Sequence, residues 1–138
     1  MASKVHQFIA DLVARRMNID GYEIVSFEGY SQSEVIKLKL PPKIIRHRPD
    51  LIGIKSNSIA LGEAKTINDF HQRTKEQLED FTNGLLSLRA DNKVYLGIPL
   101  SFEDEANKII KLWNLNASNL IILAIPDRLL PYDETNNP

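Results

Sequence analysis

The sequence predicts an α/β domain in which helices flank a mixed sheet. An amphipathic helix pattern opens the chain, and two apolar runs around a polar break at Ser56–Asn57 predict a β-hairpin. Strand-like and helix-like segments then alternate, which favours parallel pairing. The expected order is therefore α-β-β-β-α-β-α-β. With 138 residues the chain fits one domain over 1–132, and polar residues 133–138 are expected to form a flexible C-terminal tail.

The first helix is expected from about Ser3 to Met17, with Ser3 as its N-cap. Its apolar residues recur at spacings of three and four: Val5, Phe8, Ile9, Leu12, Val13 and Met17. Strands are predicted over Tyr22–Phe27 and Glu34–Leu40. Pro41–Pro42 ends the second of these, because proline cannot donate to a sheet ladder.

The hairpin has a register that follows from its turn. If Ser56 and Asn57 are the turn residues, with Asn57 suited to a left-handed conformation, the strands pair as Ile54–Ile59, Ile52–Leu61 and Asp50–Glu63. Because strand side chains alternate, these pairs share one face. The opposite face carries mostly small residues that allow a helix to approach closely: Gly53, Ala60, Gly62 and Ala64.

Two carboxylates should then face each other at the open end of the hairpin. Directly opposed residues have Cβ atoms roughly 4.5–5.5 Å apart, so Asp50 and Glu63 would repel unless a cation lies between them. Mg²⁺ commonly uses one or two carboxylates, and Lys65 falls on the Glu63 face, close enough to contact a phosphate. The alternative is a solvated strand end with ordinary surface charges.

Two more helices and two more strands follow the hairpin. A long helix is expected from about Asn68 to Arg89, with Asn68 or Asp69 as its cap. Lys93–Ile98 predicts a strand, and Ser101 is expected to cap the next helix. The continuous apolar run Leu120–Ile125 is typical of a strand buried on both faces. These last two strands should be parallel, joined by the helix between them.

The composition of the chain bears on its location in the cell and on the partners that it could bind. The chain has no cysteine and no apolar run of about 20 residues, which favours a cytoplasmic protein without a membrane span. Net charge is only −1, but the segment between Glu34 and Asp50 contains no acid. We interpret this segment as a phosphate-contacting stretch; an edge strand protected by lysines explains the same pattern. Its basic residues are Lys37, Lys39, Lys43, Arg46 and Arg48.

Pro49-Asp50, followed after twelve residues by Glu63-Ala64-Lys65, resembles the PD-(D/E)-x-K signature of the restriction-endonuclease-like nucleases. The expected element order also matches their α/β core. The resemblance implies that Asp50, Glu63 and the backbone carbonyl of Ala64 bind Mg²⁺ or Mn²⁺. It further implies that Lys65 orients the attacking water and stabilises charge on the phosphate.

Two further positions compare with subgroups of these nucleases. Gln77 and Phe81 resemble the Q-x-x-x-Y motif of RecB-type nucleases, with phenylalanine in place of tyrosine. Gln77 is therefore a candidate catalytic residue, although an exposed structural glutamine fits the pattern equally well. Many members also carry a glutamate on the first helix. Here no glutamate is present, and Asp11 is either its substitute or a solvent-facing aspartate.

The expected function is metal-dependent hydrolysis of DNA phosphodiester bonds, by endonuclease or exonuclease action. A second hypothesis is a nucleic-acid-binding or assembly module that keeps the nuclease fold and cleaves nothing. A third is an acidic ligand-binding protein, which requires that the acidic pair binds no metal. Because so small a domain has little surface for reading DNA sequence, we expect structure-selective binding, a homodimer or a separate specificity subunit.

Overall fold

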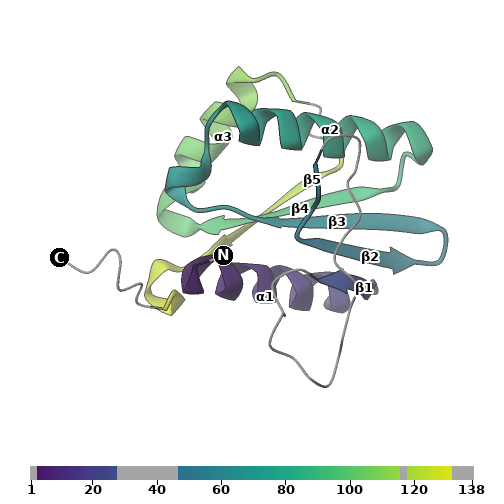
Figure 1. The fold of residues 1–138 in the computed structure, drawn as a ribbon, viewed down its shortest axis with the longest axis horizontal. Coiled ribbons are helices and arrows are strands. Elements are labelled where there is room, and N and C mark those ends of the chain that lie inside the picture. Colours follow the sequence, from purple (N-terminus) through teal and green to yellow (C-terminus); the bar gives the residue numbers. More distant parts are fainter. Residues whose placement is uncertain (1–2, 28–46, 116–117, 132–138) are drawn as a thin grey trace.

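The computed structural model describes residues 3–27, 47–115 and 118–131, with the side chains of 86 and 87 excepted. A five-stranded sheet forms the middle layer, with strand order β1-β2-β3-β4-β5. In Figure 1 the helix α1 (Lys4–Ile19) covers one face of the sheet, and α2 (Gln72–Leu88) and α3 (Glu103–Leu112) cover the other. The expected strand Glu34–Leu40 and the tail 133–138 lie outside the described residues.

The sheet is mixed, as predicted. Its first three strands, β1 (Glu23–Phe27), β2 (Leu51–Lys55) and β3 (Ser58–Ala64), are antiparallel neighbours. The strands β4 (Lys93–Pro99) and β5 (Leu120–Ile125) then extend the sheet from β3 in parallel. The described helices and strands follow the order α-β-β-β-α-β-α-β, in which β1 and the two hairpin strands are the three strands before α2, and the additional predicted strand Glu34–Leu40 is not among them.

The β2–β3 hairpin has the predicted register, with Ile54 paired to Ile59 and Ile52 paired to Leu61. One detail of its turn differs from expectation. Ser56, not Asn57, adopts the left-handed conformation, at φ 53°. The turn is still two residues long, so the pairing of every residue beyond it is unchanged.

The small residues of the hairpin lie under a helix, as predicted, and that helix is α1. A Cβ atom added to Gly62 would lie 2.9 Å from Val13 Cγ1, and one added to Gly97 on β4 would lie 2.5 Å from Val13 Cγ2. Any larger residue at either position would push the helix away from the sheet. Ser3 caps α1 by accepting a hydrogen bond from the His6 N–H at 3.1 Å. This close packing brings the first turns of α1 to the open end of the hairpin.

The helix α2 begins later than predicted. Residues Ile67–Asp69 form a separate short 3₁₀ turn, and α2 starts at Gln72. The reason lies in Asp69, whose Oδ2 accepts hydrogen bonds from the Thr66 N–H and hydroxyl at 2.7 and 2.9 Å, and so is directed backward along the chain. The buried residues of α2 include Leu78, Phe81 and Leu85, whereas Leu88, which has the same helical spacing, is 68% exposed at the end of the helix.

Two expectations for the C-terminal third are wrong. Ser101 does not cap α3; its hydroxyl donates to Asp127 Oδ2 at 2.6 Å, and α3 begins at Glu103 after a 3₁₀ turn. β5 packs against helices on both faces of the sheet, but most of its residues are only half-buried, because no strand of the described sheet lies beyond it. Among the described helices, none is long and apolar enough to cross a membrane.

Candidate active site

The open end of the hairpin brings Asp50 and Glu63 together, as the register predicts. The Asp50 N–H donates to Glu63 Oε1 at 2.7 Å, and the Ala64 N–H donates to Asp50 Oδ2 at 2.9 Å. Glu63 therefore accepts a hydrogen bond from the backbone of Asp50, and Asp50 accepts one from the backbone of the residue that follows Glu63. This reciprocal arrangement holds both side chains in one orientation at the end of the sheet.

Both carboxyl groups are buried, with 9% of Asp50 and 2% of Glu63 exposed. Burial, followed by the charge of Asp50, raises the pKa of Glu63 to about 8, although Lys65 works to lower it. In the absence of a metal ion, Glu63 therefore holds a proton at neutral pH. A divalent cation at this position would favour the ionised form and release that proton.

Lys65 and Gln77 belong to the same cluster. The Lys65 ammonium donates to Gln77 Oε1 at 2.7 Å and lies 3.3 Å from Glu63 Oε2. Lys65 comes directly after β3, where its N–H donates to the Gly97 carbonyl at 3.0 Å, and Gln77 projects from α2. Of the two interpretations of Gln77, the geometry favours the one that places it in the site. Phe81 is fully buried in the core.

His6, on α1, also reaches the site and was not among the predicted residues. Its Nε2 lies 3.2 Å from Asp50 Oδ2, while its Nδ1 is buried without a hydrogen-bond partner among the residues that the structure describes. Burial works to lower the pKa of His6, but the hydrogen bond to Asp50 and the charges of Asp50 and Glu63 give a net upward shift. His6 precedes Ile9 by three residues and Ala10 by four, so its spacing places it on the buried face of the helix.

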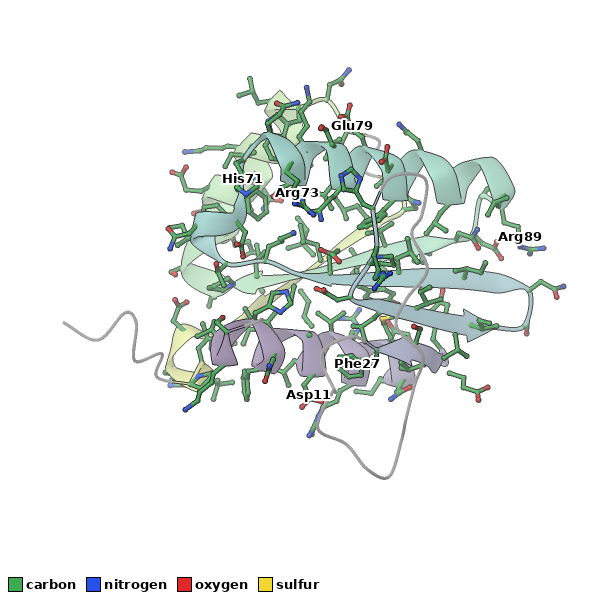
Figure 2. All side chains as sticks on the ribbon, viewed as in Figure 1. Asp11, Phe27, His71, Arg73, Glu79 and Arg89 are labelled. Carbon is green, nitrogen blue, oxygen red and sulfur yellow. The ribbon has the colours of Figure 1, made fainter. Side chains whose placement is uncertain are left out.

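Asp11 lies elsewhere. Its Oδ2 is 3.4 Å from Arg15 Nε, one turn along the helix. Figure 2 shows Asp11 on the side of α1 that faces away from the sheet. The residue that α1 brings to Asp50 is therefore His6, and the interpretation of Asp11 as a solvent-facing aspartate fits this placement.

The donor atoms around Asp50 and Glu63 determine whether a divalent metal ion could bind there. Within the described ranges, no three His, Asp or Glu side chains are grouped so that they could hold a metal ion. The two adjacent carboxyl groups nevertheless supply the hard oxygen donors that Mg²⁺ and Mn²⁺ prefer, and Mg²⁺ often binds through one or two carboxylates and several waters. The N–H of Ala64 points toward Asp50, and in an extended strand the carbonyl of the same residue points to the same side. Asp50, Glu63 and the Ala64 carbonyl therefore fit such an ion.

Only one residue of the basic stretch can be placed. Lys37, Lys39, Lys43 and Arg46 lie outside the described residues, whereas Arg48 is exposed two residues before Asp50. The neighbouring His47 is fixed to α2, since its Nδ1 lies 2.8 Å from Asp80 Oδ2. Arg48 is thus held between an anchored histidine and the buried Pro49–Asp50 pair, with its side chain in solvent.

The cluster joins side chains from α1, the hairpin and α2: His6, Asp50, Glu63, Lys65 and Gln77. It combines two acidic oxygen donors, a cation held by an amide, and an imidazole, which together suit the binding of a metal ion and a phosphate. Comparison of the chain with models of known protein families, with curated proteins and with solved structures found no match.

Proposed function

We propose that the protein is a metal-dependent deoxyribonuclease that hydrolyses DNA phosphodiester bonds. The observation that carries this proposal is the contact of Lys65 with both Glu63 and Gln77, at the end of a hairpin that also presents Asp50. These residues are the ones on which the resemblance to the PD-(D/E)-x-K nucleases depends. The restriction-endonuclease-like form of the α/β fold is part of the same proposal, as is a cytoplasmic location.

In this proposal Asp50, Glu63 and the Ala64 carbonyl hold Mg²⁺ or Mn²⁺, which when bound supplies a more acidic water and charge neutralisation at the phosphate. Lys65 places a positive charge beside the phosphate and orients the attacking water. Gln77 fixes the ammonium through the 2.7 Å hydrogen bond. His6 holds Asp50 from the side of α1. Water is the nucleophile, so no covalent enzyme intermediate is required.

The second candidate is a nucleic-acid-binding or assembly module that cleaves nothing. The observation in its favour is that three carboxylate oxygens of the pair already contact groups in the described part of the chain. Asp50 Oδ2 accepts from Ala64, Glu63 Oε1 accepts from Asp50, and Glu63 Oε2 lies beside Lys65. Such a network can be a self-sufficient structural element, and metal binding and cleavage must be measured to separate the two functions.

Mn²⁺ is expected to bind the wild-type protein and to lose most of its affinity in Asp50→Asn. Asparagine keeps the shape and one oxygen of the side chain but removes its charge, which a divalent cation requires. Isothermal titration calorimetry on both proteins measures the difference. Asp91→Asn is the matched control, because Asp91 is an exposed carboxylate that pairs with Arg89 at the other end of the hairpin. Equal Mn²⁺ affinity in Asp50→Asn and Asp91→Asn would contradict the metal site.

A cleavage assay then tests the function itself. Linear, nicked, circular, single-stranded and four-way-junction DNAs are incubated with Mg²⁺, Mn²⁺ or a chelator, and the products are sized. Cleavage of closed circles indicates endonuclease action, whereas shortening only from free ends indicates exonuclease action. Metal binding without cleavage of any of these DNAs would favour the non-catalytic candidate.

The basic stretch is expected to contribute to DNA affinity. Each phosphate contact adds about 0.9 to the magnitude of the slope of log affinity against log salt on duplex DNA. Replacing Lys43, Arg46 and Arg48 by alanine should flatten this slope, measured by fluorescence anisotropy across a salt series. Replacing Lys108, Lys111 and Arg128, which are exposed on α3 and after β5, provides a charge-matched control. The same slope in the two triple variants would show that the stretch makes no special phosphate contacts.

A further inference from the structure

The outer edge of β5 presents backbone groups that have no strand beside them in the described sheet. The Val94 N–H donates to the Asn119 carbonyl at 2.8 Å, and Val94 pairs with Leu120 in a parallel register. In a parallel ladder alternate residues bond to the neighbouring strand, so Ile121, Leu123 and Ile125 direct their N–H and C=O groups toward β4. The corresponding groups of Leu120, Ile122 and Ala124 point outward.

The two edge strands of the sheet differ in how they discourage pairing. β1, at one edge, has an irregularity between Ile24 and Ser26 and carries an exposed glutamate at Glu23. β5, at the other, pairs with β4 without interruption over six residues and contains no charge, proline or bulge. Natural sheets commonly protect their edges with charges, prolines or bulges, and β5 lacks all three.

We propose that a second copy of this chain occupies the β5 edge, by antiparallel pairing about a two-fold axis at Ile122. This axis places Leu120 opposite Ala124 of the second copy, Ile121 opposite its Leu123, and Ile122 opposite itself. The outward N–H and C=O groups of one copy then meet those of the other. Because the strand carries no charge, the pairing brings no like charges together, and every pair is apolar on both faces.

Side chains on both faces of β5 support this occupant. Ile121 and Leu123 pack on the α1 side of the sheet, and Leu120 and Ile122 pack on the side of α2 and α3, yet all four remain half-buried. A second β5 strand would cover part of the remaining apolar surface in both layers. No site residue lies on β5, so this inference stands or falls independently of the proposed nuclease activity.

The test removes one outward-pointing backbone N–H by replacing Ile122 with proline. In Ile122→Pro the intermolecular donor is lost, but no hydrogen bond to β4 is lost, because Ile122 directs its N–H away from β4. Ile122→Val is the matched control, since it keeps the N–H. Light scattering coupled to size-exclusion chromatography across a dilution series is expected to give a dimer for wild type and Ile122→Val, and a monomer for Ile122→Pro. A monomeric wild-type protein at all concentrations would overturn the proposal.

Ala124→Lys provides a second variant in case proline prevents folding, because a lysine can extend into solvent from a sheet edge. It is expected to be folded, by circular dichroism, and monomeric. Hydrogen exchange should show slow amides at Leu120, Ile122 and Ala124 in the wild type and faster ones in this variant. A folded Ala124→Lys protein that remains a dimer, with these amides unchanged, would assign the interface to another surface.

Discussion

Replacing Glu63 with glutamine is expected to stabilise the metal-free protein increasingly as pH rises from 4.5 to the Glu63 pKa of about 8, and to abolish Mn²⁺ binding. Glu63 is buried beside Asp50, so ionising it in the folded state is unfavourable. A group whose folded-state pKa is raised contributes stability fully below its ordinary pKa, here 4.5, and this contribution is lost as pH rises through the folded-state value. Glutamine has no charge to bury and retains an oxygen that accepts the Asp50 N–H.

Urea unfolding of the two proteins from pH 5 to 9, in chelator, measures this effect. The free energy of unfolding of Glu63→Gln relative to wild type should rise with pH, reaching about 2–4 kcal/mol at the alkaline end. Glu105→Gln, at an exposed position on α3, should show no such trend. Added Mn²⁺ should raise the unfolding temperature of wild type but not of Glu63→Gln. A difference between Glu63→Gln and wild type that is flat across this pH range would show that Glu63 ionises without cost.

The hairpin could be predicted because its information is local. Alternation of apolar and small residues on both sides of a two-residue turn determines the pairing of Ile54 with Ile59, and the same register brings Asp50 to Glu63. The close docking of a helix on this sheet face was predictable for a related reason. A row of glycine and alanine on one sheet face leaves room for one close helix, and Val13 contacts the sheet at Gly62.

His6 could not be found in the same way, because its place in the site depends on how α1 lies across the sheet. The contacts of Val13 with Gly62 and Gly97 set that position, and they join residues far apart in the sequence. His47 and Asp80 meet across a separation of 33 residues for the same kind of reason. Asp11 is the acidic residue of the first helix, but its side chain pairs with Arg15, and the helix face toward the sheet carries the imidazole of His6.

β5 shows a second limit of what could be predicted from the sequence. A continuous apolar run indicates that both faces of a strand are covered, and α1 and α3 do lie on the two sides of β5. It does not indicate whether a strand lies beside each edge, because backbone groups along the edge are the same for every sequence. Ser101 illustrates the point at a single residue: its spacing suits a cap, but Asp127 on the neighbouring connection offers both of its oxygens.

Replacing Lys65 with alanine is expected to lower the rate of DNA cleavage by roughly a hundredfold or more, because phosphate charge stabilisation and water positioning are both lost. The free energy of unfolding of Lys65→Ala should differ little from that of the wild type. The substitution removes a cation beside Glu63, but that carboxyl group already holds a proton at neutral pH and is not left as an unpaired buried charge. The Gln77 amide loses its 2.7 Å partner at a half-buried position, where water can replace it.

Single-turnover cleavage with Mn²⁺ measures this loss, beside thermal unfolding and Mn²⁺ calorimetry on the same preparations. Lys108→Ala, an exposed lysine on α3, should cleave as wild type does. Gln77→Ala should fall between the two, because it keeps the ammonium but releases it from its fixed position. If Lys65→Ala cleaves as fast as Lys108→Ala, the assignment of this motif to catalysis is wrong. If wild type and every variant bind Mn²⁺ and DNA but cleave none of the DNAs tested, the buried network serves binding or assembly instead.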